Sequence, residues 1–269
     1  MKGIKLYRKS NGQIISSTRL ADVFDNWRHR EEKWLFIGPH DDDVVIGAGL
    51  MLQKAGDAGI PVSVLIATDG RMGYCKEEER DVISRVRKTE AAASFDVLGI
   101  EDVCWLDFPD CDLSSYIGRH LAKENEPCII GRHTGLQNAF TYHIRRIRPT
   151  RIFLPSDADY HPDHKITYQE VLISMFHACG EIWPELGSPC LTLPQAYEMP
   201  IYHDLGEEPD IKIEASAESL ERKLISIGMY KSQKQYALLV ENLRKSGPVE
   251  YFRDIQYRIY SPQNYQSVF

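Results

Sequence analysis

Four short apolar runs alternate with stretches of helical periodicity, and this rhythm constrains the fold more than any other feature of the chain. The runs span residues 34–38, 62–67, 103–108 and 151–155. Runs this short and this continuous are typical of parallel strands that are covered on both faces. Helical patterns follow at 44–58, 78–98, 138–147 and 165–179. The alternation predicts an α/β fold, with an open, doubly wound, mainly parallel sheet of Rossmann-like type and helices on both faces.

The segments outside this rhythm are less regular. Residues 1–32 predict an N-terminal elaboration, with a short hairpin about Asn11-Gly12 and a helix over 18–30. Later patterns predict a strand at 197–203, one or two helices in 216–244 interrupted at Gly228, and a strand at 251–260. The proline-rich stretch 184–194 predicts a loop near the site or a lid. A chain of 269 residues fits one large domain or two small ones, and we expect a single domain, 1–269.

Composition narrows the class of protein. A hydrophobic fraction of 43% is that of a globular chain, and a net charge of -7 disfavours nucleic acid as a partner. No apolar stretch approaches the roughly 20 residues that span a bilayer, so we expect no membrane partner. Six cysteines without a C-x-x-C pair are typical of reduced thiols. We therefore expect a cytoplasmic protein, and a homo-oligomer stays open.

A polar cluster follows each apolar run. HDDD (40–43) follows the first run, TDGR (68–71) the second, PD (109–110) the third and SDADYHPDH (156–164) the fourth. In open parallel sheets, ligands bind beyond the carboxyl ends of the strands. We therefore expect the four clusters to converge on one rim of the sheet and to form one site.

Two of these clusters carry histidine and aspartate at the spacing of metal ligands. His40 and Asp43 are three residues apart across a strand-to-helix turn, and His161 and His164 repeat the spacing around a proline that suits a first helical turn. Taken alone, each aspartate is more often a helix cap and each histidine a loop residue. A catalytic zinc ion takes three such ligands and leaves one position open. Together the clusters predict a Zn2+ site made of one ligand pair and one further histidine, with Asp42 beside it as a general base.

Six stretches of the chain follow one another in a characteristic order. They are PHDDDVVIGAG (39–49), ATDGRMG (67–73), VRKTEAAASFDVLGI (86–100), WLDFPD (105–110), RPTRIFLPSDADYHPDH (148–164) and KLISIGMYKSQ (223–233). In order and spacing they resemble the PIG-L or LmbE-like deacetylases, zinc-dependent enzymes that hydrolyse the N-acetyl group of N-acetylglucosamine conjugates. The resemblance implies that His40, Asp43 and His164 bind zinc and that Asp42 activates water.

The same resemblance implies roles for four further residues. His161 would stabilise the oxyanion or protonate the leaving amine, with Asp163 orienting it. Arg87 would contact the sugar or its substituent, and Asp110 would lie near sugar hydroxyls. The sequence therefore favours a metal-dependent hydrolase whose partner is a small-molecule amino-sugar conjugate.

Other functions stay open at this stage. Asp41 stands where the family often has proline, and Val44-Val45 replaces a common acid, which motivates a zinc-binding but catalytically weak sugar-binding or accessory protein. Gly47-Ala48-Gly49 suggests a dinucleotide-binding oxidoreductase, although the third glycine of that motif is missing. Arg71 and Arg87 near the rim leave an anionic substituent on the substrate open. Six other histidines have no metal-like context and are expected to be structural or exposed: His29, His120, His133, His143, His177 and His203.

Overall fold

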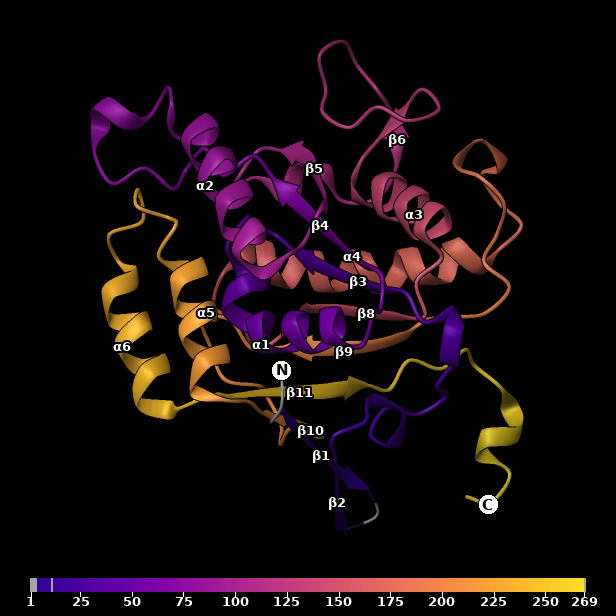
Figure 1. The fold of residues 1–269 in the computed structure, drawn as a ribbon. Helices are drawn as coiled ribbons and strands as arrows, with labels where there is room; N and C mark the ends of the chain where they lie inside the picture. The colour runs from indigo at the N-terminus through magenta and orange to yellow at the C-terminus, as the bar shows by residue number, and fades with distance from the viewer. Residues whose placement is uncertain (1–3, 11, 269) are drawn as a thin grey trace.

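The computed structural model describes residues 4–10 and 12–268 and contains one large sheet flanked by helices (Figure 1). Its strands are β1 (Lys5–Ser10), β2 (Gln13–Ser17), β3 (Trp34–Gly38), β4 (Val62–Thr68), β5 (Asp102–Phe108), β8 (Arg151–Pro155), β9 (Gln195–Met199), β10 (Ile211–Glu214) and β11 (Val249–Ile255). A small separate sheet holds β6 (His120–Leu121) and β7 (His133–Thr134). The α-helices are α1 (Asp43–Asp57), α2 (Ile83–Leu98), α3 (Leu136–Ile147), α4 (Pro162–Cys179), α5 (Ala217–Ile227) and α6 (Tyr236–Ser246). The expected α/β class is confirmed.

The large sheet is mixed, and its two halves differ in strand direction. Strands β9, β8, β3, β4 and β5 are neighbours in that order and pair in parallel. Strands β11, β10, β1 and β2 extend the β9 edge, and each of these pairs is antiparallel. The four apolar runs are β3, β4, β5 and β8, so the expected parallel arrangement holds for the half that they build. The antiparallel half comes from the two ends of the chain, where the sequence pattern is weaker.

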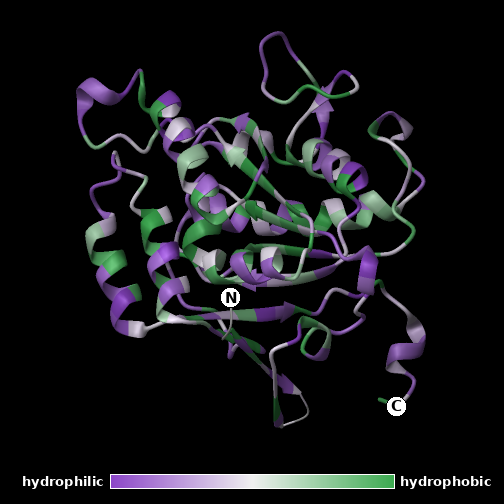
Figure 2. Ribbon diagram, in the orientation of Figure 1, coloured by the Kyte–Doolittle hydropathy of each residue, from purple (hydrophilic) through white to green (hydrophobic). Residues whose placement is uncertain are grey.

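Alternate side chains of the central strands enter two cores, one on each face of the sheet. Trp34 and Phe36 of β3 belong to the core shared with α1 and α2, whereas Leu35 and Ile37 belong to the core shared with α3 and α4. All four side chains are fully buried. Figure 2 shows the hydrophobic residues gathered in the central strands and on the inner sides of the helices. Because both faces are covered, the run has no polar alternation.

The N-terminal elaboration differs from the expected one in its helix. The hairpin is confirmed as β1 and β2, although Asn11 of its turn lies outside the described residues. The helix predicted over 18–30 is wrong, because the segment forms only two 3-10 turns, Leu20–Asp22 and His29–Glu31. Asn26 (φ 54°) and His29 (φ 48°) adopt left-handed conformations that end a helix. The segment lies instead against the sheet, where Phe24 is buried.

The later elements follow the expected order with shifted boundaries. The strand predicted at 197–203 is β9 and ends at Met199, and the one predicted at 251–260 is β11. The helical region 216–244 is two helices, with Gly228 directly after the last residue of α5. Strand β10 was not predicted, because its sequence IKIE alternates apolar and polar residues over only four positions.

The Gly47-Ala48-Gly49 stretch lies inside α1 and serves close packing. A Cβ at Gly47 would lie 3.0 Å from the carbonyl oxygen of Pro200, and one at Gly49 would lie 2.8 Å from the side chain of Lys223. Both glycines therefore let later parts of the chain approach the helix. This packing accounts for the glycines without a dinucleotide, so the oxidoreductase hypothesis loses its motive.

Candidate metal centre and adjoining pocket

The candidate site lies at the carboxyl ends of the parallel strands, where the chain turns from β3 into α1. A Cβ on Gly38 would lie 2.8 Å from the carbonyl oxygen of His40, so this tight turn requires glycine. The turn is tied to β4, because the amide and the hydroxyl of Thr68 both donate to the carbonyl oxygen of Pro39, at 2.9 and 2.8 Å. Backbone contacts therefore fix the direction in which His40 leaves the sheet.

His40, Asp43 and His164 bring one atom each to a single point. His40 Nδ1 lies 3.2 Å from Asp43 Oδ2, His164 Nε2 lies 3.4 Å from the same oxygen, and the two nitrogens are 3.4 Å apart. Four tetrahedral ligands at about 2.0–2.1 Å from zinc are roughly 3.3–3.4 Å from one another. The three side chains are buried. Both the donor set and its spacing therefore fit a zinc ion.

Each of the two histidines has a carboxylate at its other ring nitrogen. Asp110 Oδ1 lies 3.1 Å from His40 Nε2, and Asp159 Oδ2 lies 3.1 Å from His164 Nδ1. Carboxylates in this position select the tautomer and hold the ring of a metal-binding histidine. Sequence reasoning did not assign Asp159, although its place two residues before His161 in DADYHPDH was an available signal.

His161 and Asp163 lie at the start of α4. His161 is the N-cap residue, and its Nδ1 accepts a hydrogen bond from the amide of Asp163 (3.2 Å). Burial lowers the pKa of His161, and the nearby His40 and His164 lower it further. A neutral ring with an accepting Nδ1 carries its proton on Nε2. The described contact between the two residues uses the backbone of Asp163, whose carboxylate instead accepts from the amide of Cys111 (2.9 Å).

The ring of His161 also belongs to a looser acidic group. Ligand atoms of His40, Asp110, His161 and Asp163 all lie within 4.8 Å of one another, and so do those of the three histidines His40, His161 and His164. These sets share His40 with the tighter triangle. Several overlapping sets of the described residues could therefore bind a cation at this position.

Next to the triangle, Arg87, Asp41 and Asp42 form a buried cluster of ion pairs. Arg87 pairs with Asp41 and lies 3.3 Å from Asp42 Oδ2. Burial raises the pKa of Asp42, Arg87 acts against that rise and the neighbouring aspartates add to it, which leaves the pKa at about 7. Asp42 is the N-cap residue of α1, but its side chain makes no cap hydrogen bond, so capping does not explain it. Asp41, which had no assigned role, is the partner of Arg87.

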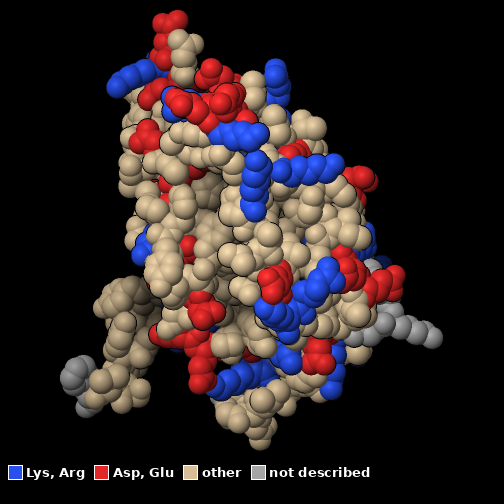
Figure 3. All heavy atoms as spheres, turned by 90° about the vertical axis from the view of Figure 1, so that its left-hand side faces the viewer, with Lys and Arg blue, Asp and Glu red and all other residues tan. Residues whose placement is uncertain are grey.

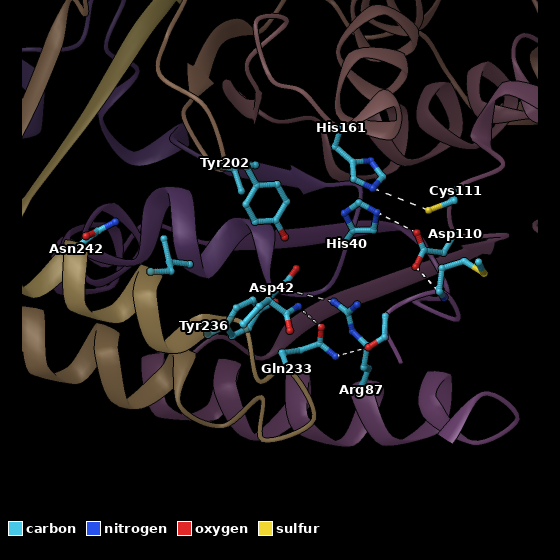
Figure 4. A pocket seen from close by; sticks show the side chains of 15 residues that line it. His40, Asp42, Arg87, Asp110, Cys111, His161, Tyr202, Gln233, Tyr236 and Asn242 are labelled. Atoms are coloured by element: carbon cyan, nitrogen blue, oxygen red, sulfur yellow. Dashed lines mark hydrogen bonds and ion pairs between the residues drawn. The ribbon is translucent and has the colours of Figure 1, made fainter. Parts of the chain in front are cut away.

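A pocket of about 480 Å³ opens beside these residues (Figure 4). Of the expected site residues, it is lined by His40, Asp42, Arg87, Asp110 and His161. The rest of the lining comes from residues 72–73, 111, 201–202, 233 and 235, and from α6. Sequence reasoning missed the part from α6, whose first residue lies just past the last matching motif.

Two other segments lie away from this pocket. The 184–194 stretch, which was expected near the site or as a lid, contributes no lining residue. Arg145 of α3 holds its first part by donating to the carbonyl oxygens of Trp183 and Gly187, at 2.9 and 3.0 Å. In Figure 1 the 184–194 stretch lies on the opposite side of the molecule from α6. The six histidines without metal-like context are likewise absent from the pocket lining.

Comparison with known proteins assigns the chain to a family. The family model PIG-L, described as GlcNAc-PI de-N-acetylase, matches residues 35–175, just over half of the chain. The chain belongs to the PIG-L family. The matched region of this PIG-L protein contains all eight expected site residues, whereas α5 and α6 lie outside it.

Two curated relatives are deacetylases by name. Diacetylchitobiose deacetylase of Thermococcus kodakarensis is 32% identical over 138 residues, which are 50% of this chain and 45% of that protein. This chain therefore matches less than half the length of that relative. Probable N-acetyl-alpha-D-glucosaminyl L-malate deacetylase 2 of Bacillus cereus is 25% identical over 214 residues, 77% of this chain and 86% of that protein.

A solved structure shares the fold over nearly the whole chain. N,N'-diacetylchitobiose deacetylase from Pyrococcus horikoshii, determined with its inhibitor MPG, superposes with a TM-score of 0.71 at 22% identity and covers 91% of each chain. At this identity the likeness concerns the fold. Among the residues described here, no helix is long and apolar enough to cross a membrane.

Proposed function

We propose that this PIG-L protein is a metal-dependent hydrolase that removes the N-acetyl group from an N-acetylglucosamine-type conjugate. The observation that carries the proposal is the triangle of His40 Nδ1, Asp43 Oδ2 and His164 Nε2, with edges of 3.2 to 3.4 Å. Family membership and the deacetylase names of two relatives support the reaction class.

The three residues of the triangle would hold Zn2+. When bound, zinc supplies a Lewis acid that polarises the amide carbonyl and lowers the pKa of a bound water toward about 7. Asp43 would ligate through the oxygen that already accepts from the amide of His40 (2.7 Å). Asp110 and Asp159 would keep His40 and His164 in the tautomers that present a lone pair to the metal.

Asp42 is proposed to accept the proton of the attacking water. It lines the pocket directly beside the triangle, and no hydrogen-bond partner of its Oδ1 is found among the described residues. Burial and the neighbouring aspartates raise the pKa of Asp42, and a divalent cation bound beside it would favour its anionic form, which is the form that takes up a proton. Arg87, 3.3 Å from the other carboxylate oxygen, would hold this carboxylate in place.

His161 is proposed to act on the other side of the amide. Its Nε2–H lines the pocket and would stabilise the oxyanion of the tetrahedral intermediate or protonate the leaving nitrogen. Asp163 would orient it through the amide that donates to Nδ1 (3.2 Å). Amide hydrolysis needs an activated water, a polarised carbonyl, an oxyanion donor and a proton for the leaving nitrogen. Zinc held by the triangle, together with Asp42 and His161, would supply all four.

Asp110 and Arg87 were expected to contact the substrate, but their partners in the structure favour roles in positioning other residues of the site. Both carboxylate oxygens of Asp110 are engaged, one by His40 and the other by the amide of Met72 (3.1 Å). Burial opposes ionisation of Asp110, but the hydrogen bond and charge of His40 outweigh it and lower its pKa to about 2. Asp110 would therefore position His40, and Arg87 would position Asp42.

The proposal also covers the domain organisation of the chain and its cellular setting. We infer one domain over 1–269 with a Rossmann-like, doubly wound parallel half, because β3, β4, β5 and β8 share one continuous sheet with both cores. Six cysteines without a disulfide among the described residues support a reducing, cytoplasmic setting.

The test is release of acetate and free amine from N-acetylglucosamine conjugates by zinc-loaded protein. We expect turnover by the wild type and roughly 10²–10⁴-fold slower turnover by Asp42→Asn at unchanged zinc content. A zinc-binding accessory protein would instead bind metal and ligand and release no amine. Absence of turnover on a broad panel of conjugates would sink the enzymatic proposal.

A further inference from the structure

The wall of the pocket opposite the candidate metal ligands carries no charge. Among the described residues, this wall consists of Gln233, Gln235 and three residues of α6, Tyr236, Leu239 and Asn242. Ile201 and Tyr202, which are also uncharged, line the pocket nearer the metal ligands, where the ring of Tyr202 stacks on His164. In the close view, Tyr236 and Asn242 lie on the α6 side of Asp42, and His40, His161 and Asp110 lie on its other side (Figure 4). The wall therefore offers amide, hydroxyl and apolar groups to whatever the reacting sugar carries.

The guanidinium that lines the pocket is already neutralised. Arg87 is 4% exposed and is engaged by Asp41 and Asp42. The turn at Gly70 and Gly73 covers it, since a side chain at Gly73 would collide with the guanidinium. Both contacts use Nη2, and Nε has no hydrogen-bond partner among the described residues, so two carboxylates balance the charge of Arg87 although not all of its donors are engaged.

The second arginine near the rim is also engaged. Arg71 Nε donates to Asp69 Oδ2 (2.6 Å), and Arg71 does not line this pocket. With both arginines paired to carboxylates, the lining of the pocket provides no unpaired cation among the described residues.

The surroundings of the reacting centre are instead strongly acidic. Six aspartates gather around it: Asp41, Asp42, Asp43, Asp110, Asp159 and Asp163. One guanidinium and one divalent cation leave carboxylates in excess, and within about 8 Å such charges are poorly screened at physiological salt. An anionic group in the pocket would be repelled, whereas a neutral one would not.

We propose that the substrate carries an uncharged, hydroxyl-bearing aglycone, such as a second neutral sugar or a polyol, and that the pocket discriminates against carboxylate or phosphate groups there. The inference rests on the proposed function for the identity of the reacting sugar. The amide of Asn242 donates and accepts at once, which suits hydroxyl groups, and the rings of Tyr202 and Tyr236 offer flat apolar surface to a sugar face. The amide of Gln233 is already engaged, because it donates to the carbonyl oxygen of Gly73 (2.7 Å) and accepts from Gln235 (2.8 Å). In the space-filling view, the middle of the face that carries α6 is largely uncharged, with charged side chains gathered above and below it (Figure 3).

The experiment compares two ligands that differ in one group, N-acetylglucosaminyl glycerol and N-acetylglucosaminyl glycerate. Calorimetry on zinc-loaded Asp42→Asn protein measures binding without turnover. We expect the glycerol conjugate to bind at least about tenfold tighter at low salt, with the ratio narrowing as salt rises. Equal or tighter binding of the glycerate conjugate, or no binding of either, would overturn the proposal.

A charge placed on the wall sharpens the test. Asn242 is exposed on α6, so Asn242→Arg is expected to fold normally and to shift the binding ratio about tenfold toward the glycerate conjugate. The matched variant Asn242→Gln keeps the wall neutral and should leave the ratio unchanged. If Asn242→Arg leaves the ratio unchanged as well, the wall does not select on charge.

Turnover by the wild type separates this proposal from the proposed function. Amine release from both conjugates with equal kcat/KM would support deacetylation and contradict the charge selection. Selective binding of the glycerol conjugate without amine release from either would support the charge selection and contradict deacetylation.

Discussion

The two sides of the pocket are held in different ways. The acidic side is built on the ends of four parallel strands, of which β3 and β8 are wholly buried, and its side chains are fixed by backbone and carboxylate contacts on several elements. The other side is formed largely by α6, in which Tyr236 is the one buried residue and Leu238 is 73% exposed. The reacting groups thus lie on the rigid sheet, whereas the groups that would select the substrate lie on a peripheral helix. Such a helix can vary in sequence without disturbing the chemistry.

The largest expected effect comes from breaking the triangle. Asp43→Ala removes a ligand and the acceptor of the His40 amide, so zinc content should fall to background and amine release should become undetectable. Elemental analysis and the amine assay on the same sample measure both. Leu239→Ala on the opposite wall is the control and should keep its zinc. Full zinc content in Asp43→Ala would place the metal elsewhere, for example in the looser group around Asp110 and His161.

A smaller effect is expected from the group that faces the oxyanion. His161→Ala removes the Nε2–H donor but none of the three triangle atoms. We expect kcat to fall roughly 10²–10³-fold with zinc affinity changed far less. Steady-state kinetics and a zinc competition assay give the two values. A large loss of zinc with little loss of kcat at saturating zinc would make His161 a ligand instead.

Asp159 tests whether the carboxylates behind the histidines matter. Asp159→Asn keeps the size of the side chain but replaces the carboxylate 3.1 Å from His164 Nδ1 with an amide. Zinc affinity should fall about 10–100-fold, with kcat largely recovered at saturating zinc. Titration of metal-stripped protein with a chromophoric zinc chelator measures the affinity. Unchanged affinity would show that His164 is positioned by packing alone.

The mildest effect is expected on the α6 side. Leu239→Ala shortens an apolar side chain of the wall that is partly buried against the core. We expect KM to rise a few-fold, about 1 kcal/mol of binding, with kcat and zinc content unchanged. A fall in kcat of more than tenfold without a change in KM would mean that α6 takes part in the chemistry, and the division between the two sides would fail.

The same division explains what the sequence could and could not predict. The meeting of the HDDD and HPDH clusters was predictable because each follows a strand whose apolar run is visible, and parallel strands bring their carboxyl ends to one rim. The choice of His164 over His161 as the third ligand came only from the family resemblance. The contact of Arg87 with Asp41 and the role of Asp159 were not predictable, because each depends on side-chain orientation within a cluster. A local sequence pattern predicts the structure of a short segment more readily than the contacts between side chains that are far apart in the sequence.

The segments near the chain ends show the same limit. The helix expected over 18–30 had a suitable pattern, but left-handed residues Asn26 and His29 interrupt it and Phe24 is buried against the sheet. Strand β10 is four residues long and forms only by pairing with β1 and β11. The α6 wall lies beyond the region that the family model matches, so neither motif nor family pointed to it.

The most direct test of the central claim is a zinc titration of metal-stripped protein, followed by release of amine from N-acetylglucosaminyl glycerol. We expect activity to rise linearly to one zinc per chain, and we expect Asp42→Asn to bind the same one zinc but to stay at least about 100-fold less active throughout. Activity that is independent of zinc, or equal activity in Asp42→Asn at equal zinc content, would contradict the central claim.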